Sequence, residues 1–564
     1  MRPVAPITPA EFFHLLQRCI PPVGWPTKLS VANSGGPDST ALLFLLTATV
    51  RDRSGLQERA PSLSWLNNTG LFREIISIHV NHDLQPAARS MEATAANNAR
   101  LCGAPSVVEK IQWGHPPFPS QPGDGTAGEK VAREARYNRL FGAMQWIKSN
   151  VIAFAHHADD QVETVVMRMS QGSSPRGLAG MRPVRRWGMG QRDSKLYSFG
   201  ANGMRSWIVR PLLHVPKDRL LATCEANGLD YVNDPTNFQP ALTLRNAIRK
   251  ELSKKACTYQ LKEAPYVSEA TSQAPTVDIT PYVYKLRAIV PDVAPAEQPR
   301  EAVRRLGIRL EEVETQVTEI LNRARLPSPP STLLLASSAL AEATDKTVRT
   351  ELIRRCLRFV SPGPWGSLWA EGHGDRDTYQ RIANQLWPPF FTSLLERRPF
   401  TAGAGVAANP VAIPRNPGRR AVRFSAPEKG EADGWLLSRA EPYQKTKSMA
   451  DLSTLVDVTD ALVHAMNNPR GRGGYSLLYD NRFFIDFDLE HMPWDVAKEI
   501  LARNARVTVR PETRWFLPNV TIDGKTPREI GRLFWKIDGW QQPRRPPLQQ
   551  SWIKMKFVRT LDAI

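Results

Sequence analysis

Paired cysteines are absent from the sequence. Five cysteines lie far apart in 564 residues, and no two of them form a C-x-x-C pair: Cys19, Cys102, Cys224, Cys257 and Cys356. This pattern disfavours a disulfide framework and a zinc finger, and it fits a reducing compartment. Long apolar runs are absent too, because no stretch approaches the ~20 continuous apolar residues of a membrane span. We therefore expect a soluble globular protein with no membrane partner.

Acidic residues are too few to balance the basic ones. The chain has 74 Lys and Arg against 55 Asp and Glu, a formal net charge of +19 and a pI near 9.9. A surplus of this size favours polyanionic partners such as nucleic acid, through Coulomb attraction and counterion release. A generally basic proteome or compartment explains the charge equally well, so both interpretations stay open.

The amino-terminal part of the chain alternates short apolar runs with helical patterns. Residues 29–32, 75–80 and 151–155 are strand-like, and a helical pattern follows each of them. Strands that alternate with helices predict parallel pairing through right-handed crossovers. We therefore expect an α/β domain with a parallel, Rossmann-like sheet.

Two stretches indicate domain boundaries further along the chain. Residues 256–299 are rich in Pro, Ser, Thr and Ala without clear periodicity, and residues 401–434 are basic and rich in Pro, Gly and Ala. At roughly 150 residues per domain, the length allows three to four domains. We predict a catalytic α/β domain at 1–255, a linker or insertion at 256–299, a small helical domain at 300–390, a second linker at 391–434 and a C-terminal α+β domain at 435–564.

A glycine-containing hexapeptide, Ser-Gly-Gly-Pro-Asp-Ser at 34–39, joins the first strand to an apolar helix. Gly35 and Gly36 let the backbone turn sharply towards a ligand, and the helix start adds unpaired N–H donors and a positive dipole end. This arrangement predicts a pyrophosphate cradle. It is neither a P-loop nor a dinucleotide fingerprint, because Gly-Lys-Ser/Thr and G-x-G-x-x-G are both missing. An ordinary tight turn is the alternative interpretation.

Polar residues also follow the next strands. Asn81 and His82 end the second strand-like run, and 156–160, with Asp159 and Asp160, follow the third. Because the carboxyl ends of parallel strands meet at one edge of a sheet, we expect these groups and the hexapeptide in one cleft. The two aspartates either cap a helix or, with Asp38, hold Mg²⁺. A zinc site is disfavoured, since H-E-x-x-H is absent and no cysteine is near.

The hexapeptide resembles the signature of the PP-loop ATP pyrophosphatases, and further segments resemble the tRNA(Ile)-lysidine synthetase family. In the family's order, the matching segments between residues 29 and 249 are Ser34–Ser39, His79–His82, Glu129–Tyr137, His156–Thr164, Gly177–Met181, Arg210–Leu213, Asp234–Asn237 and Arg245–Arg249. The resemblance implies a PP-loop catalytic domain, a helical middle domain and a C-terminal α+β domain. Gln85 and Gln171 depart from the family's usual basic residues, which puts two tRNA contacts in doubt.

The resemblance implies transfer of free L-lysine onto C2 of the wobble cytidine of an isoleucine tRNA with a CAU anticodon. ATP with Mg²⁺ first adenylates the C2 oxygen, the lysine ε-amine then attacks C2, and AMP leaves. The amine has a pKa of about 10.4 in water and must lose a proton, so the site needs a base. The sequence does not rank the candidates Asp38, His157, Asp159 and Asp160. Arg133, Arg136 and Arg249 are expected to neutralise phosphate charge.

Contacts to ATP and tRNA follow from the same resemblance. The expected ATP-binding residues are Ser34, Gly35, Gly36, Pro37, Asp38, Ser39, Asn81 and His82. The expected tRNA-binding residues of the catalytic domain are Arg133, Tyr137, Arg245, Asn246 and Arg249. In the C-terminal segment, Arg528, Arg532 and Lys536 lie among aromatic residues, a mixture that grips RNA. An ordinary aromatic core with a solvated basic face explains that segment equally well.

Two other functions remain open from the sequence. A tRNA thiolase on the same scaffold needs paired cysteines for sulfur or an iron–sulfur cluster, which the scattered cysteines do not provide. A tRNA-binding homologue without catalysis is the second alternative. The long inserts fit a eukaryotic, fungal member of the family, for which we expect a mitochondrial location, with the cytoplasm as the alternative. The oligomeric state is open, and a homodimer is one option.

Overall fold

The computed structural model describes most of the chain. The described residues are 4–52, 70–85, 87–123, 126–173, 175–191, 194–233, 245, 248–249, 252, 279–374, 376–387, 397–414, 422–425, 427–428, 431–441, 454–468, 474–524, 526–538, 540 and 550–564. Within these ranges, no helix is both long and apolar enough to cross a membrane.

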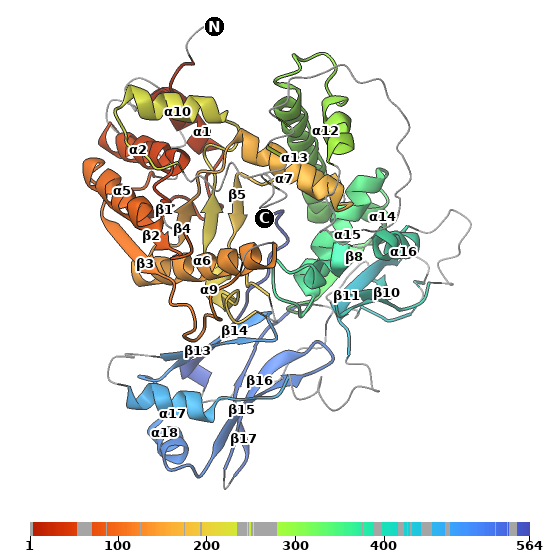
Figure 1. The fold of residues 1–564 in the computed structure, drawn as a ribbon. Helices are drawn as coiled ribbons and strands as arrows, with labels where there is room; N and C mark the ends of the chain where they lie inside the picture. The colour runs from red at the N-terminus through yellow and green to blue at the C-terminus, as the bar shows by residue number, and fades with distance from the viewer. Residues whose placement is uncertain are drawn as a thin grey trace, which may run out of the picture.

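A six-stranded sheet forms the centre of the amino-terminal domain (Figure 1). Its strands are β1 (Lys28–Ala32), β2 (Glu74–Asn81), β3 (Ser106–Lys110), β4 (Val151–Ala153), β5 (Val184–Arg186) and β6 (Trp207–Val209). The strand order is β3-β2-β1-β4-β6-β5, and all neighbours are parallel except β5 and β6. The chain order reverses between β1 and β4, and ligands of such sheets bind at the carboxyl ends of strands at this switch point. The predicted Rossmann-like fold is confirmed.

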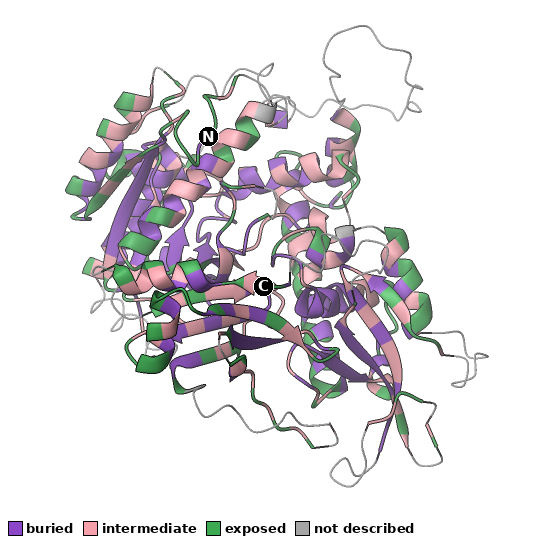
Figure 2. Cartoon of the chain, turned by 90° about the horizontal axis from the view of Figure 1, so that it is seen from below, coloured by how far each residue is buried: buried purple, intermediate pink, exposed green. Residues whose placement is uncertain are grey.

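Helices cover both faces of this sheet. The helices of this domain are α1 (Pro9–Gln17), α2 (Pro37–Arg51), α5 (Ala88–Leu101), α6 (Thr126–Trp146), α7 (Ala158–Ser170), α8 (Pro175–Leu178), α9 (Gly200–Arg205) and α10 (Lys217–Ala226). Of these, α7 packs against the helices within residues 280–324 and not against the sheet. On one face, α1, α2 and α10 share a core with Leu29 and Val31 of β1. On the other, α6 shares a core with Ile78 and Ile152. Figure 2 shows buried strands beneath helices with exposed outer sides, as binary patterning requires.

The middle region combines helices with an antiparallel sheet. Its helices are α12 (Thr280–Arg287), α13 (Gln298–Ala324), α14 (Ser337–Leu340), α15 (Lys346–Val360), the 3-10 helix η2 (Trp369–Gly374) and α16 (Arg376–Leu386). Its strands are β7 (Arg325–Leu326), β8 (Leu333–Ala336), β9 (Phe400–Gly403), β10 (Val406–Ile413) and β11 (Ala432–Arg439), in the order β7-β8-β11-β10-β9.

The C-terminal region contains two antiparallel sheets with helices on one side. A four-stranded sheet has the order β12-β15-β16-β17, and a three-stranded sheet has the order β13-β14-β18. The elements are β12 (Val456–Asp457), α17 (Thr459–Asn467), β13 (Gly474–Tyr479), β14 (Phe483–Asp488), α18 (Trp494–Leu501), β15 (Arg506–Glu512), β16 (Leu517–Asp523), β17 (Arg528–Arg532), η5 (Gln550–Trp552) and β18 (Ile553–Phe557). This agrees with the α+β fold predicted for the region.

The two predicted linkers are not simple connections where the structure describes them. The stretch 256–299 contains α12, whose Val283 and Leu286 are buried against α7 and α13, while 253–278 lies outside the described residues. The stretch 391–434 contains β9, β10 and the start of β11, so the region predicted as helical at 300–390 shares a sheet with it. The glycines that indicated a linker form the turn between β9 and β10, where Gly403 and Gly405 have φ of 86° and 68°.

A segment near the C-terminus, residues 558–564, connects the regions of the molecule. The Arg559 guanidinium donates to the carbonyl oxygen of Arg358 at 2.8 Å, and the carbonyl oxygen of Asp562 accepts from Arg358 at 2.6 Å. The Asp562 carboxylate also accepts from Arg186 of β5 at 2.9 Å. This segment therefore ties the middle region to the edge of the catalytic sheet, and Figure 1 shows its end at the centre of the molecule.

Candidate active site

The hexapeptide forms a tight turn at the start of α2. Gly35 has a φ of +78°, and a Cβ there would lie 2.4 Å from the carbonyl oxygen of Met91. The Asn33 side chain holds the turn, because its Oδ1 accepts from the Gly35 N–H at 3.0 Å and from Ser39 Oγ at 3.2 Å. Gly36 is the N-cap of α2 and supplies no side-chain cap. No side chain therefore caps the N–H groups in the first turn of α2. Such uncapped N–H donors are what an anion site needs.

Asp38 lies in the first turn of α2 and faces α7. Its Oδ1 is buried and has no hydrogen-bond partner among the described residues. Its Oδ2 lies 3.6 Å from His157 Nε2 and 3.9 Å from Lys217 Nζ. Burial would raise the pKa of Asp38, but the hydrogen bond with His157 and the charges of Lys217 and Arg249 lower it below its ordinary value. An ionised carboxylate with one unused oxygen is therefore aimed into the site.

His157 is the N-cap of α7 and lies between two carboxylates. It forms a capping box with Asp160, in which the His157 N–H donates to Asp160 Oδ2 at 3.1 Å. Its Nε2 lies 3.5 Å from Asp160 Oδ2, on the same side as Asp38. Burial would lower the pKa of His157, but Asp38, Asp160 and Asp159 raise it. The site thus stabilises the protonated form of His157, which holds the carboxylates. A protonated imidazole cannot accept a proton, so His157 fits the predicted role of base less well.

The raised pKa of His157 predicts a pH dependence of stability. The folded protein keeps the His157 proton to higher pH than the unfolded chain, whose imidazole titrates at about 6.5. The stabilisation is fully present below that pH and is lost as pH rises through the folded-state pKa. We expect urea unfolding to show a larger free-energy gap between wild type and His157→Gln at about pH 5.5 than at about pH 8.5. His14→Gln, on the exposed side of α1, is the control, and a gap that widens with pH would contradict the assignment.

Asp159 and Asp160 are neighbours in sequence but have different partners. Asp159 Oδ1 accepts from Arg300 of α13 at 2.9 and 2.7 Å, and its Oδ2 accepts from the Lys217 N–H at 3.0 Å. Asp160 Oδ1 lies 3.9 Å from Arg249 Nη2. Among the described residues, no group of three or more His, Cys, Asp or Glu side chains is arranged to hold a metal ion. The predicted three-carboxylate magnesium site is therefore not preformed, because Asp159 is turned towards Arg300 and Lys217.

A buried glutamate, Glu163, was missed by the sequence reasoning. It lies one turn after Asp160 on α7, is 2% exposed, and accepts from Arg249 Nε at 2.5 Å. Arg245 Nε lies 3.1 Å from its other oxygen. Burial raises the pKa of Glu163 above its ordinary value, although the bond from Arg249 opposes the shift. Its i+3 spacing from Asp160 was the available signal.

Arginines gather on the other side of the site, around Tyr137 and His156. Burial would raise the pKa of Tyr137, but the charges of Arg185, Arg133, Arg210 and Arg136 lower it to about 7. Burial and the same kind of neighbours lower the pKa of His156 far below its ordinary value, and its Nδ1 accepts from Arg210 Nε at 3.1 Å. Arg136 Nε is buried without a hydrogen-bond partner among the described residues. This concentration of positive charge suits an anionic ligand.

Two residues that were predicted to contact ligands, Tyr137 and Asn81, contact other residues of the protein instead. Tyr137 is 2% exposed, and its ring packs 5.6 Å from Phe154 and 5.3 Å from Trp187 between ring centroids. It is an interior aromatic residue, so the prediction that it contacts tRNA is wrong in this structure. Asn81 donates to Glu92 at 2.5 Å, and its Oδ1 accepts from a backbone N–H, so its amide is turned away from the predicted ATP contact.

His82 is the other predicted ATP contact after β2. Burial, with the nearby Arg136 charge, lowers its pKa to about 3, so its ring is neutral. It lies on the side of the arginines and not in the cluster around Asp38. Asn246 lies outside the described residues, so its predicted tRNA contact stays a prediction.

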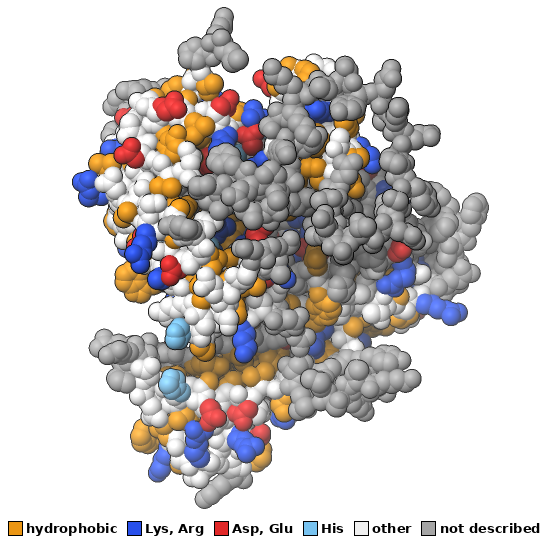
Figure 3. Space-filling view, in the orientation of Figure 1, with side chains coloured by type: hydrophobic (Ala, Val, Ile, Leu, Met, Phe, Trp, Pro, Cys, Tyr) orange, Lys and Arg blue, Asp and Glu red, His pale blue; other side chains and the backbone are white. Residues whose placement is uncertain are grey.

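The basic residues predicted to bind tRNA in the C-terminal region are mostly paired. Arg528 lies 3.4 Å from both Asp495 and Glu499, and Arg532 pairs with Glu529 and, at 3.0 Å, with Glu512. On the face drawn in Figure 3, Lys and Arg side chains of this region lie beside Asp and Glu. Of the three predicted contacts, Lys536 is the one whose side chain is exposed.

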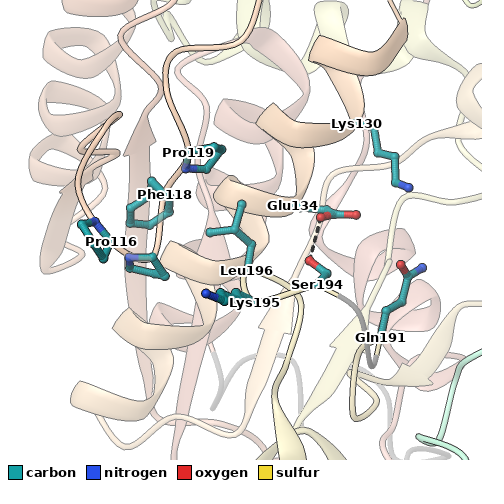
Figure 4. A pocket seen from close by; sticks show the side chains of 10 residues that line it. Pro116, Phe118, Pro119, Lys130, Glu134, Gln191, Ser194, Lys195 and Leu196 are labelled. Atoms are coloured by element: carbon teal, nitrogen blue, oxygen red, sulfur yellow. Dashed lines mark hydrogen bonds between the residues drawn. The ribbon is translucent and has the colours of Figure 1, made fainter.

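A cavity of about 640 Å³ lies on the outer side of α6 (Figure 4). It is lined by a Pro-rich loop, α6 and the hairpin between β5 and β6: Pro116, Pro117, Phe118, Pro119, Lys130, Glu134, Gln191, Ser194, Lys195 and Leu196. Ser194 Oγ donates to Glu134 at 2.9 Å across it. None of the predicted site residues line this cavity, so it is separate from the cluster at the carboxyl edge of the sheet.

Comparison with known proteins places this site in a family. A PP-loop domain model matches residues 14–256, which include the glycine turn and α7. The tRNA(Ile)-lysidine synthase of Bradyrhizobium sp. is 34% identical over 239 residues, 42% of this chain and 54% of that protein. The tRNA(Ile)-lysidine synthase of Methylobacterium sp. (strain 4-46) is 30% identical over 289 residues, 49% of this chain and 71% of that protein. The chain belongs to the tRNA(Ile)-lysidine synthase family.

Similarity to the tRNA(Ile)-lysidine synthase family is concentrated in the catalytic domain. The chain spans about half the length of several curated relatives. It covers 54% of the Bradyrhizobium protein. It is also 35% identical over 229 residues to the tRNA(Ile)-lysidine synthase of Pseudomonas aeruginosa, a match that covers 41% of this chain and 41% of that protein. Among solved structures, the U34-tRNA thiolase NcsA from Methanococcus maripaludis with its 4Fe-4S cluster matches 53% of this chain and 79% of that chain, at 15% identity and a TM-score of 0.32.

Proposed function

We propose that this protein is an ATP-dependent tRNA(Ile)-lysidine synthetase that joins free L-lysine to C2 of the wobble cytidine in a CAU anticodon. The observation that carries the proposal is the cluster of Asp38, at the start of α2, with His157 and Asp160, at the start of α7. Asp38 and Asp160 lie 3.6 and 3.5 Å from the same His157 nitrogen, directly beside the glycine turn. A phosphate cradle and two carboxylates at a sheet's switch point are what adenylation by ATP requires.

The reaction proceeds in two displacements. In the first, the C2 oxygen of cytidine attacks the α-phosphorus of ATP, and pyrophosphate leaves from the first turn of α2. In the second, the lysine ε-nitrogen attacks C2, the C2–O bond breaks, and AMP leaves with that oxygen. The amine loses its proton to a carboxylate, because only the unprotonated amine is nucleophilic.

We assign Asp160 as the carboxylate that receives the lysine side chain, because the buried Glu163 is already bound by two arginines. Glu163 lies one turn further along α7 and holds Arg249, whose Nη2 lies 3.9 Å from Asp160 Oδ1. The arginines around Tyr137, including Arg133 and Arg136, would neutralise phosphate charge on the tRNA.

The carboxylates also fit the Mg²⁺ that accompanies ATP. Mg²⁺ needs only one or two protein carboxylates beside phosphate oxygens and water. Asp38 has a buried oxygen without a partner among the described residues, and Asp160 lies beside it, so these two would hold the ion. The ion would neutralise charge on the phosphates.

The described cysteines argue against the thiolase alternative. Cys19, Cys102, Cys224 and Cys356 are buried and free. Burial raises the pKa of the Cys19, Cys224 and Cys356 thiols to about 12, which leaves almost no reactive thiolate at neutral pH. Sulfur transfer needs such thiolates, so lysine transfer is the better supported function.

Release of AMP tests the proposal directly. We expect purified protein to form AMP from ATP only when a CAU-anticodon isoleucine tRNA is present, and to form lysidine when lysine is added. Thin-layer chromatography of labelled ATP and mass spectrometry of the tRNA nucleosides measure the two steps. A transcript with a GAU anticodon is the matched control. No AMP with the CAU transcript would refute the proposal, and sulfur in place of lysine at C2 would favour the thiolase.

A further inference from the structure

The first turn of α13 reaches into the first turn of α7. Arg300 is the third residue of α13, and its Nε and Nη2 lie 2.9 and 2.7 Å from Asp159 Oδ1. The other oxygen of Asp159 accepts from the Lys217 N–H, at the start of α10, at 3.0 Å. Three helices that are far apart in the sequence thus meet at one carboxylate.

The position of Arg300 is unfavourable for α13 itself. A cation in the first turn of a helix faces the positive end of the helix dipole, which disfavours it. The neighbouring Arg304 and Arg305 are paired with Glu301, at 2.6 and 2.9 Å, on the exposed side of the helix. Asp159 supplies the negative charge that offsets the cost at Arg300, so its placement is explained by the partner on α7.

Apolar packing fixes this contact in place. Val162 and Val166 of α7 share a core with Leu286 of α12 and with Ala302 and Val303 of α13. Figure 1 shows α13 alongside α7 at the edge of the catalytic domain. The Arg300 and Asp159 side chains are only about a third exposed, at 32% and 30%, so the pair is shielded on most sides.

A short chain of contacts leads from Arg300 to the glycine turn. Arg300 holds Asp159, Asp159 holds the backbone of Lys217, and Lys217 Nζ lies 3.9 Å from Asp38 Oδ2. Asp159 Oδ2 also lies 3.7 Å from His157 Nδ1. A shift of Asp159 would therefore move both groups that face Asp38.

We propose that Arg300 is a positioning residue of the nucleotide site, through which the docking of α12 and α13 on α7 sets Asp159, Lys217 and, through them, Asp38. The inference rests on the proposed function, because it assumes that ATP binds at Asp38. It assigns to the middle region a direct part in building the site of the catalytic domain. It also assigns Asp159 to this pairing and not to the metal.

Three variants test the inference by their effect on ATP affinity and on kcat for AMP formation. We expect Arg300→Ala to weaken ATP binding about tenfold and to lower kcat by about 10- to 100-fold, since small misplacements at a reacting centre have effects of this size. Arg300→Lys keeps the charge but not the fork of donors and should recover part of the loss. Arg304→Ala, which loses only a pair with Glu301 on the same helix, should leave both values unchanged.

Coupling to Asp159 distinguishes positioning from a general loss of stability. If Arg300 acts through Asp159, then Asp159→Asn combined with Arg300→Ala will be no worse than the poorer single variant. Multiplying losses, or an Arg300→Ala protein with wild-type ATP affinity and kcat, would overturn the inference. ATP affinity is measured by calorimetry without tRNA, so the inference is tested even if wild type forms no AMP with the CAU transcript, which would refute only the proposed function.

Discussion

Asp38→Asn is expected to abolish AMP formation, with a loss on the order of a thousandfold in kcat, while tRNA affinity stays within about twofold of wild type. The substitution keeps the shape of the side chain but removes its charge. Asp38 is the ionised group beside the glycine turn, and its buried Oδ1 has no other partner among the described residues. The nucleotide site therefore loses the charge that we propose holds Mg²⁺, together with the carboxylate partner of His157.

The measurement is single-turnover AMP release, with tRNA binding followed by filter retention. Asp52→Asn, at the opposite end of α2, is the matched control and should behave as wild type. His157 keeps Asp160 and Asp159 as partners in the variant, so the protein should remain folded. A loss of tRNA binding as large as the loss of activity would show that Asp38 has been assigned the wrong role.

Gly35→Ala is the second substitution with a large expected effect. A Cβ at this position meets the Met91 carbonyl oxygen at 2.4 Å and the Met91 Cα at 3.2 Å, both backbone atoms that cannot rotate away. The φ of +78° adds a left-handed penalty of about 1 kcal/mol for alanine. We expect a loss of about 2–4 kcal/mol in unfolding free energy and ATP binding too weak to measure, because the turn must shift to relieve the overlap.

Gly103→Ala separates the two causes. Gly103 has a φ of +69° but open space around the position of a Cβ, so only the backbone penalty applies. It should lose about 1 kcal/mol, with ATP affinity unchanged. Urea denaturation and calorimetry with ATP give both quantities. Equal losses for the two variants would show that the contact with Met91 does not matter.

The sequence predicted the parts of the site that are local in the chain. The glycine turn and the start of α7 each combine a strand, a turn and a helix within about ten residues, so their pattern is readable. The meeting of Asp38 with Asp160 followed from the rule that parallel strands end at one edge of a sheet. The contacts of His157 with both carboxylates agree with this expectation, and the roles assigned to these residues stay predictions.

Long-range partners could not be predicted in the same way. Arg300 lies 141 residues from Asp159, and nothing local distinguishes it among 74 Lys and Arg residues. The family resemblance of Glu129–Tyr137 made Tyr137 an expected tRNA contact. Only its packing against Phe154 and Trp187 shows that it is interior. The strands in 391–434 were hidden because glycines of a hairpin turn resemble those of a linker.

The contact between Asp562 and Arg186 has a consequence for how the protein is made. The two residues are 376 positions apart, so this ion pair can form only after the distant segment has been synthesised. Until then, Arg186 and Arg358 lack the hydrogen bonds that residues 559–562 supply. The contact that joins the amino-terminal sheet to the middle region is thus among the most non-local in the fold, and contacts of this kind form late in folding.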